Sequence, residues 1–165
     1  MATKSKKVLT TDEQWRIVRK ICEPLGINYE KMDTTVYPTS AGIAITEKNR
    51  IEIEECLRTE DQLISLVLHE VMHILAARAG KYDVFHNAPF NGEWTERDAQ
   101  VYLKTAVFAE MYVDAQAKRA AKKLFPHVKF RAAYSNKRAR KILMRKTRTL
   151  IQWVQRTLRS QYDEI

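Results

Sequence analysis

The stretch from Leu63 to Gly80 constrains the fold most, because its apolar residues cover almost every face of a helix. Residues Thr59 to Gln62 have the pattern of a capping box, and Gly80 is suited to end the helix. A helix that is apolar all round has to lie in the centre of a domain. The sequence therefore predicts a central helix that begins near Thr59 and ends near Gly80.

Within this helix, His69, Glu70 and His73 form an HExxH pattern. Residues four apart lie on one face of a helix, so both imidazoles can bind the same metal ion. Two neutral imidazoles suit Zn²⁺, which in catalytic sites takes a third protein ligand and keeps one position open. Burying these side chains without partners would be costly, which favours a metal site over structural histidines. Glu70 is then predicted to be the general base that takes a proton from the attacking water.

Composition favours a globular protein without a membrane span. The chain has 165 residues, of which 45% are hydrophobic and 30% charged, and only 4 glycines and 4 prolines, which favours a mainly helical domain. No stretch approaches 18 uninterrupted apolar residues, and residues 1–10 lack the apolar segment of a secretory signal. Cys22 and Cys56 fit reduced thiols, and we expect a cytoplasmic or otherwise intracellular protein.

The N-terminal part predicts one more helix and a small sheet. Residues 11–14 read as a second capping box, with Thr11 as the N-cap, and helical spacing continues from there to Cys22. Residues 28–38 have the composition of a loop. Residues 41–53 alternate about a turn, as a β-hairpin does. Such a hairpin either lines a substrate cleft, where its edge can pair with an extended peptide, or only covers the central helix.

The third metal ligand has three candidates. His86 follows His73 by thirteen residues in a loop and stands between two phenylalanines, which gives it a reason to face inward. Glu96 and Glu110 lie on a further helix, predicted from Thr95 to the break at Pro126. Apolar residues surround Glu110, so a buried carboxylate there would need a partner. The residues alone leave the choice open.

HExxH followed by His86-Asn87-Ala88-Pro89-Phe90 resembles the SprT-like family of zinc metallopeptidases. The resemblance covers roughly Tyr37 to Trp94 and makes His86 the first choice for the third ligand. It implies that His69, His73 and His86 bind zinc and that Glu70 is the catalytic base. It also implies proteolysis of proteins that are associated with DNA or crosslinked to it.

Two other patterns resemble different metallopeptidases. The segment that begins at Glu96 resembles the ImmA/IrrE-type peptidases, in which a glutamate on the following helix is the third ligand. That resemblance implies cleavage of one regulatory protein. Glu110, with Asp114 one turn later, resembles the gluzincin arrangement, in which the glutamate binds the metal and the aspartate orients a histidine. A further hypothesis is a non-enzymatic nucleic-acid-binding protein with a structural metal.

Charge divides the chain into two parts. Residues 1–117 have 14 Lys and Arg against 18 Asp and Glu, whereas residues 118–165 have 15 against 2. Such a density of cations predicts a polyanionic partner, and nucleic acid would be bound through its phosphates without sequence specificity. A solvated face, an anionic membrane and an acidic protein are the alternatives. The predicted nucleic-acid-binding residues are Lys122, Lys123, Lys137, Arg138, Arg140, Lys141 and Arg145.

Together these observations predict an α+β fold of the zincin-like metallopeptidase type, mainly helical, with a small hairpin or sheet and a central HExxH helix. We expect a flexible basic tail in residues 1–10, one catalytic domain in residues 11–125, and a basic helical extension in residues 126–165 that packs on the domain. The expected cofactor is Zn²⁺, and the expected partners are a protein substrate and nucleic acid.

Overall fold

The computed structural model describes residues 7–38, 40–81 and 96–133, together with residues 140, 141, 144, 145, 148, 149, 152 and 156. For residues 96–100, 102 and 103 the description covers the backbone alone. The chain divides into two compact units, Met1–Ala79 with Val113–Ala132 and Gly80–Tyr112 with Ala133–Ile165. Helices and a three-stranded sheet make this an α+β protein, which confirms the general fold class that the sequence predicted.

Helix α1 (Thr11–Cys22) is capped by Thr10, one residue earlier than predicted. The Thr10 hydroxyl accepts a hydrogen bond from the Glu13 N–H, and the Glu13 carboxylate accepts one from the Thr10 N–H. The box closes on Glu13 because a carboxylate is favoured at the positive end of the helix dipole. After α1 the chain tightens into a 3₁₀ turn, η1 (Glu23–Leu25), and leaves through Gly26, whose φ of 60° suits glycine.

The sheet contains β1 (Asn28–Lys31), β2 (Gly42–Ile45) and β3 (Arg50–Ile53) in the order β1-β3-β2. β2 and β3 pair antiparallel over their whole length, which confirms the predicted hairpin. A 3₁₀ turn, η2 (Thr46–Lys48), connects them and ends at Asn49 in the left-handed conformation with φ 49°. Asparagine tolerates this conformation better than most residues do. Because β3 is central, β2 is an edge strand of this sheet.

The prediction of a loop for residues 28–38 was wrong in its first part, because Asn28–Lys31 form strand β1. β1 pairs in parallel with β3. Its own side chains are exposed or half-buried, so no apolar alternation marked it in the sequence. Instead the flanking residues Ile27 and Met32 are buried, and Tyr29 stacks on Trp15 with ring centroids 6.3 Å apart. Tertiary packing therefore decided the strand, as is common for β structure.

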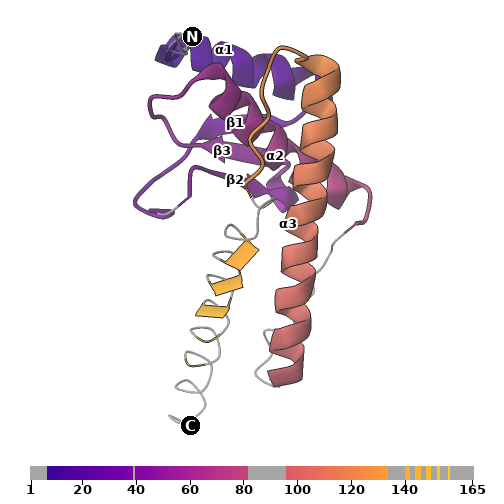
Figure 1. Ribbon diagram of the computed structural model, residues 1–165. Helices are drawn as coiled ribbons and strands as arrows, with labels where there is room; N and C mark the ends of the chain where they lie inside the picture. Colours follow the sequence, from indigo (N-terminus) through magenta and orange to yellow (C-terminus); the bar gives the residue numbers. More distant parts are fainter. Residues whose placement is uncertain are drawn as a thin grey trace, which may run out of the picture. The chain divides into compact units, whose positions relative to one another are not determined.

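Helix α2 (Glu60–Arg78) is the central helix that the sequence predicted. The Thr59 N–H donates to the Gln62 side-chain oxygen over 2.9 Å, and the helix ends at Ala79 and Gly80, whose φ is 64°. The predicted capping box and glycine stop are thus confirmed. α2 packs against α1, β2 and β3 (Figure 1). Because α2 is covered on several sides, polar residues on it need partners within the protein.

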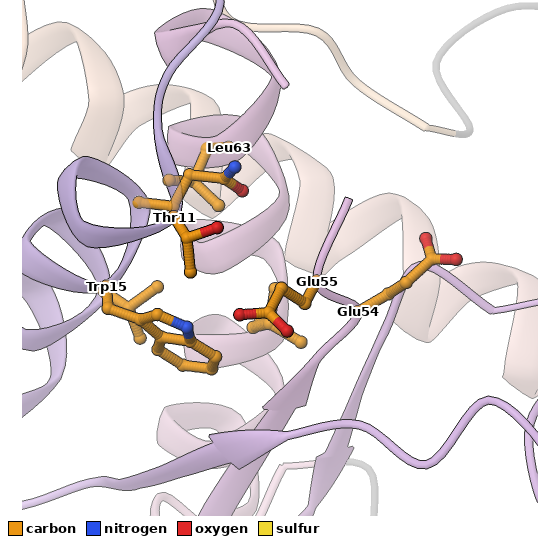
Figure 2. Close-up of a pocket in the computed structure, with 8 residues that line it drawn as sticks. Thr11, Trp15, Glu54, Glu55 and Leu63 are labelled. Atoms are coloured by element: carbon orange, nitrogen blue, oxygen red, sulfur yellow. The ribbon is translucent and has the colours of Figure 1, made fainter. Parts of the chain in front are cut away.

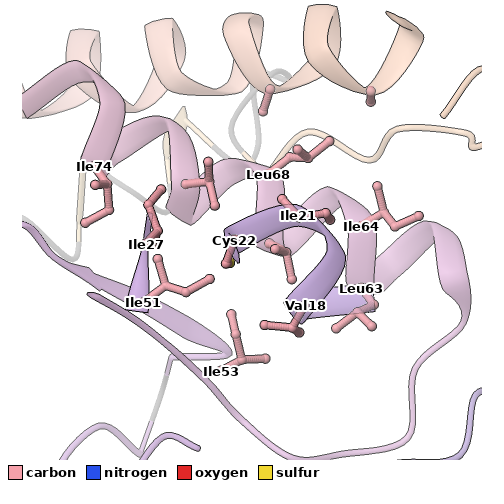
Figure 3. Packing of buried hydrophobic residues seen from close by; sticks show 14 of the residues in the cluster. Val18, Ile21, Cys22, Ile27, Ile51, Ile53, Leu63, Ile64, Leu68 and Ile74 are labelled. Carbon is pink, nitrogen blue, oxygen red and sulfur yellow. The ribbon is translucent and has the colours of Figure 1, made fainter. Parts of the chain in front are cut away.

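The hydrophobic core of the first unit lies around α2, with contributions from α1, β3 and the later turns of α3. Figure 3 shows these side chains pointing toward one another. Burying each large aliphatic side chain contributes about 1.5–3 kcal/mol. The helix that carries the HExxH pattern is therefore held firmly. The largest fully buried side chains are Ile51, Leu63, Ile64, Leu68, Ile74, Val18, Val67, Val71, Val113 and Cys22.

Helix α3 (Glu96–Leu124) is the second long helix that the sequence predicted, with 29 residues. Its residues from Val113 onward belong to the first unit, where Ala117 and Ala121 are buried in the core. Its earlier residues belong to the second unit. None of the helices among the described residues combines the length and apolar character that crossing a bilayer requires.

The segment after α3, residues 125–132, is called the strap below. Its backbone is tied to α2, because the Lys129 N–H donates to the Asp61 carboxylate over 3.2 Å. The Arg131 N–H donates to the Ser65 hydroxyl over 2.9 Å. The strap thereby follows α2 toward the HExxH pattern. Its apolar side chains that pack in or against the core are Phe125, Val128 and Phe130.

Candidate metal centre

α2 places His69 and His73 one turn apart on the same face, as the HExxH pattern predicted. Their Nε2 atoms are 3.2 Å apart, and their ring centroids are 4.9 Å apart. His69 is buried and His73 is half-buried. The two imidazoles therefore direct ring nitrogens to a common point beside α2.

Asp114 on α3 contacts the His69 ring at Nδ1. Its Oδ1 lies 2.9 Å from Nδ1 of His69, and the carboxylate is only 4% exposed. A carboxylate in this position accepts the Nδ1 proton, which leaves the Nε2 lone pair free to bind a metal ion. Among the alternatives from the sequence, the gluzincin resemblance implied that Asp114 orients a histidine, and the residue that Asp114 contacts in the structure is His69.

Glu110 completes a group of three potential ligands. It lies one turn before Asp114 on the continuous helix α3, so both carboxylates occupy the same helix face. A Glu110 carboxylate oxygen and ring nitrogens of His69 and His73 all lie within 4.8 Å of one another. Of the three predicted third ligands, Glu110 is the one whose described side chain meets the two histidines.

The donor set fits a zinc ion. Zn–N bonds of about 2.0–2.1 Å in a tetrahedral site place two nitrogens about 3.3 Å apart. The two Nε2 atoms are 3.2 Å apart. Two imidazoles and one carboxylate also form a ligand set that catalytic zinc sites use. The Nε2 lone pair of His69 points close to the His73 ring. This arrangement is favourable when a cation or a proton lies between the two rings.

Glu70 follows His69 directly and is 7% exposed. It lies one helical turn after Leu66, on the side of α2 that meets β2. A Cβ atom at Gly42 would approach Leu66 Cδ1 to 3.2 Å, so strand and helix are in close contact there. At 100° per residue, Glu70 lies about 40° from Leu66 around α2, so it is carried near the helix face that contacts the edge strand.

The other candidate ligands to consider are the two remaining predicted residues and the two cysteines. His86 lies outside the described residues, as does the side chain of Glu96, and both remain predictions. Among the described residues neither cysteine belongs to the group, since Cys22 lies in the core and Cys56 is exposed. Burial raises the pKa of the Cys22 thiol to about 12, so this thiol stays protonated at neutral pH.

The predicted nucleic-acid-binding residues are exposed wherever the structure describes them. Lys137 and Arg138 lie outside the described residues. Residues 140, 141, 144, 145, 148, 149, 152 and 156, which the structure describes in this segment, are helical. The exposed predicted residues are Lys122, Lys123, Arg140, Lys141 and Arg145.

The sequence analysis missed Asp61 and Ser65, although their spacing was a usable signal. Asp61, Ser65, His69 and His73 recur every four residues and form one polar stripe along an otherwise apolar helix. Asp61 and Ser65 are only 6% and 4% exposed, and both accept hydrogen bonds from the strap. One stripe of α2 therefore anchors the strap with its first half and carries the histidines on its second half.

A small pocket between α1, β3 and α2 is unsuited to a ligand (Figure 2). Its interior of about 10 Å³ has room for a single water molecule. It shares no residue with the group formed by the two histidines and Glu110. Its lining residues are Thr11, Gln14, Trp15, Val18, Ile53, Glu54, Glu55 and Leu63.

Asp114→Asn is expected to weaken zinc binding by about 10- to 100-fold. Asparagine keeps the shape of the side chain but removes the charge, and its amide can donate to Nδ1 and favour the wrong tautomer of His69. Zinc affinity is measured by competition with a chromophoric chelator. Asp33→Asn, the same change at an exposed site that caps Thr35, is the control and should bind zinc as wild type does. An unchanged affinity in Asp114→Asn would contradict the orienting role.

No family model, no curated protein and no solved structure matches this chain.

Proposed function

We propose that this protein is a zinc-dependent peptidase whose metal ligands are His69, His73 and Glu110. The observation that carries the proposal is the group of three ligand atoms within 4.8 Å, next to the glutamate of the HExxH pattern. Structural zinc sites use four protein ligands, whereas hydrolytic sites use three and keep one position open. Three ligands among the described residues favour the hydrolytic kind.

Each residue of the centre has a distinct part in the proposed reaction. When bound, zinc supplies a Lewis acid that polarises the scissile carbonyl and lowers the pKa of a water molecule. His69, His73 and Glu110 hold the ion, and Asp114 keeps the His69 ring oriented. The Glu70 carboxylate accepts a proton from the attacking water and then donates it to the departing amine.

The proposal takes Glu110 as the third ligand in place of His86. The Glu110 and Asp114 pair, on a helix that follows HExxH, resembles the gluzincin arrangement. The contact between Asp114 and His69 supports this choice, because an orienting aspartate is part of that arrangement. His86 as a ligand, and with it the SprT-like resemblance, stays a prediction.

The edge strand β2 is the proposed substrate-binding element. Its antiparallel register with β3 directs the backbone groups of Gly42 and Ala44 away from β3. An extended peptide can add to such an edge through main-chain hydrogen bonds. Because β2 packs against α2 near Leu66, a peptide on this edge would lie along the helix that carries Glu70.

For the substrate class, we propose proteins bound to nucleic acid inside the cell. The supporting feature is the charge of residues 118–165, where 15 Lys and Arg stand against 2 Asp and Glu. Phosphates attract such a segment without sequence specificity. Binding of nucleic acid would raise the local concentration of proteins that share the same strand.

Removing the metal tests the proposal directly. Protein purified without added metal is expected to contain about one zinc per chain, by elemental analysis. A strong chelator should abolish cleavage of denatured casein, and added Zn²⁺, but not Mg²⁺, should restore it, because imidazole ligands suit Zn²⁺ better. A protein that contains no zinc and binds none when it is offered would contradict the proposal.

A further inference from the structure

The first unit carries a group of exposed cations on α3 and the strap, called the α3–strap surface here. We propose that this surface binds the phosphate backbone of nucleic acid, and that it does so separately from the C-terminal residues 133–165. This inference extends the proposed association with nucleic acid. Its test measures the binding of DNA and does not need peptidase activity. The surface consists of Lys118, Arg119, Lys122, Lys123, Lys129 and Arg131, all exposed.

The α3 part of the surface lies outside the helix face that carries Glu110 and Asp114. Asp114, Ala117 and Ala121 are buried and share one face of α3. At 100° per residue, Arg119 and Lys123 fall opposite this face and Lys118 and Lys122 fall beside it, and all four are exposed cations. Nucleic acid on these cations would leave the ligands and the edge strand accessible to a protein substrate.

The strap part of the surface has a fixed backbone. The hydrogen bonds to Asp61 and Ser65 hold the amides of Lys129 and Arg131, and both acceptors are buried on α2. The alternate residues of the strap pack their apolar side chains against the core. Lys129 and Arg131 therefore extend outward from a held backbone, which reduces the entropy lost when they bind a partner.

Acidic residues close in sequence do not balance the positive charge of the α3–strap surface. The sequence contains no Asp or Glu between Asp114 and Asp163. None of the six cations forms a salt bridge with another described residue. Like charges closer than a Debye length of about 8 Å repel one another. A polyanion relieves this repulsion and gains further free energy by releasing its own counterions.

Nucleic acid fits this surface better than a lipid membrane does. Faces that bind membranes combine cations with several large apolar side chains that enter the lipid. Among the described residues of the α3–strap surface and its neighbours in residues 115–131, the exposed large apolar side chain is Leu124. Binding of phosphates through charge alone is typical of sequence-independent contacts with DNA or RNA.

Two full-length variants with equal loss of charge test the inference. The surface variant combines Lys118→Gln, Arg119→Gln, Lys129→Gln and Arg131→Gln. The matched control combines Arg140→Gln, Lys141→Gln, Arg145→Gln and Arg148→Gln, which removes four charges from exposed C-terminal positions. Binding to fluorescein-labelled single-stranded and duplex DNA is measured by anisotropy between 50 and 200 mM salt. Circular dichroism checks that both variants are folded, and vesicles containing phosphatidylserine serve as the membrane probe.

The surface variant is expected to bind DNA about tenfold or more weakly than wild type. Its salt dependence should also decrease, by about one unit of slope for each lost phosphate contact. The control should lose less affinity than the surface variant. Equal losses would show that net charge alone matters and would overturn the inference, as would a larger loss in the control. Wild-type protein that binds the vesicles but not DNA would overturn it in favour of a membrane.

Discussion

Glu70→Gln is expected to lower kcat for peptide hydrolysis by at least about 100-fold while leaving the zinc content unchanged. Glutamine has nearly the same shape as glutamate, but its amide cannot accept a proton from the attacking water. Glu70 is not one of the three ligand residues, so the ion should stay bound. Initial rates on a fluorogenic peptide library, together with elemental analysis of the same preparation, measure both effects.

Glu60→Gln is the matched control for this experiment, because it makes the same change in the first turn of α2, where the Glu60 side chain is 46% exposed. Its kcat should stay within about twofold of wild type, since surface substitutions away from a site have small effects. Glu70→Gln protein with full activity and bound zinc would show that Glu70 is not the general base.

Glu110→Ala is expected to weaken zinc binding by more than the 10- to 100-fold that follows from losing an orienting partner. The alanine variant keeps both histidines but lacks the carboxylate that completes the group of three ligands. Two ligands leave the ion bound mainly to water, so peptidase activity should be lost together with zinc. Zinc affinity by competition, and the visible spectrum of the Co²⁺-substituted protein, measure the change in coordination.

His86→Ala and Glu96→Ala distinguish this arrangement from the other two predicted ones. Both variants are expected to keep about one zinc per chain if Glu110 is the third ligand. Loss of zinc in His86→Ala alone would instead support the SprT-like ligand set, and loss in Glu96→Ala alone would support the ImmA/IrrE-type set. Each result assigns the third ligand from one set of purified proteins.

Local sequence signals predicted the helices well. The start of α2 at Thr59 and its stop at Gly80 are set by a capping box and a left-handed glycine, which act over only a few residues. The apolar residues around α2 predicted its central position, because they have to be buried. The predicted N-cap of α1 was wrong by one residue. Thr10 and Thr11 can both serve as N-cap, and the position of Glu13 decides between them.

Contacts between distant segments could not be predicted in the same way. β1 became a strand through its pairing with β3, while its own side chains carry no strand pattern. The strap is held by Asp61 and Ser65, more than sixty positions earlier in the chain. Such pairings depend on which surfaces meet after folding, and a residue's neighbours in sequence do not contain that information.

The candidate metal centre shows the same division between local and distant signals. The sequence by itself determined the pair His69 and His73 with Glu70 beside them, because the helical period alone sets their spacing. Only the tertiary structure brought Glu110 to the two histidines and Asp114 to His69, across separations of 37 to 45 residues along the chain. A ligand on another helix depends on how the two helices pack and on their register, and the packing of the whole core decides both.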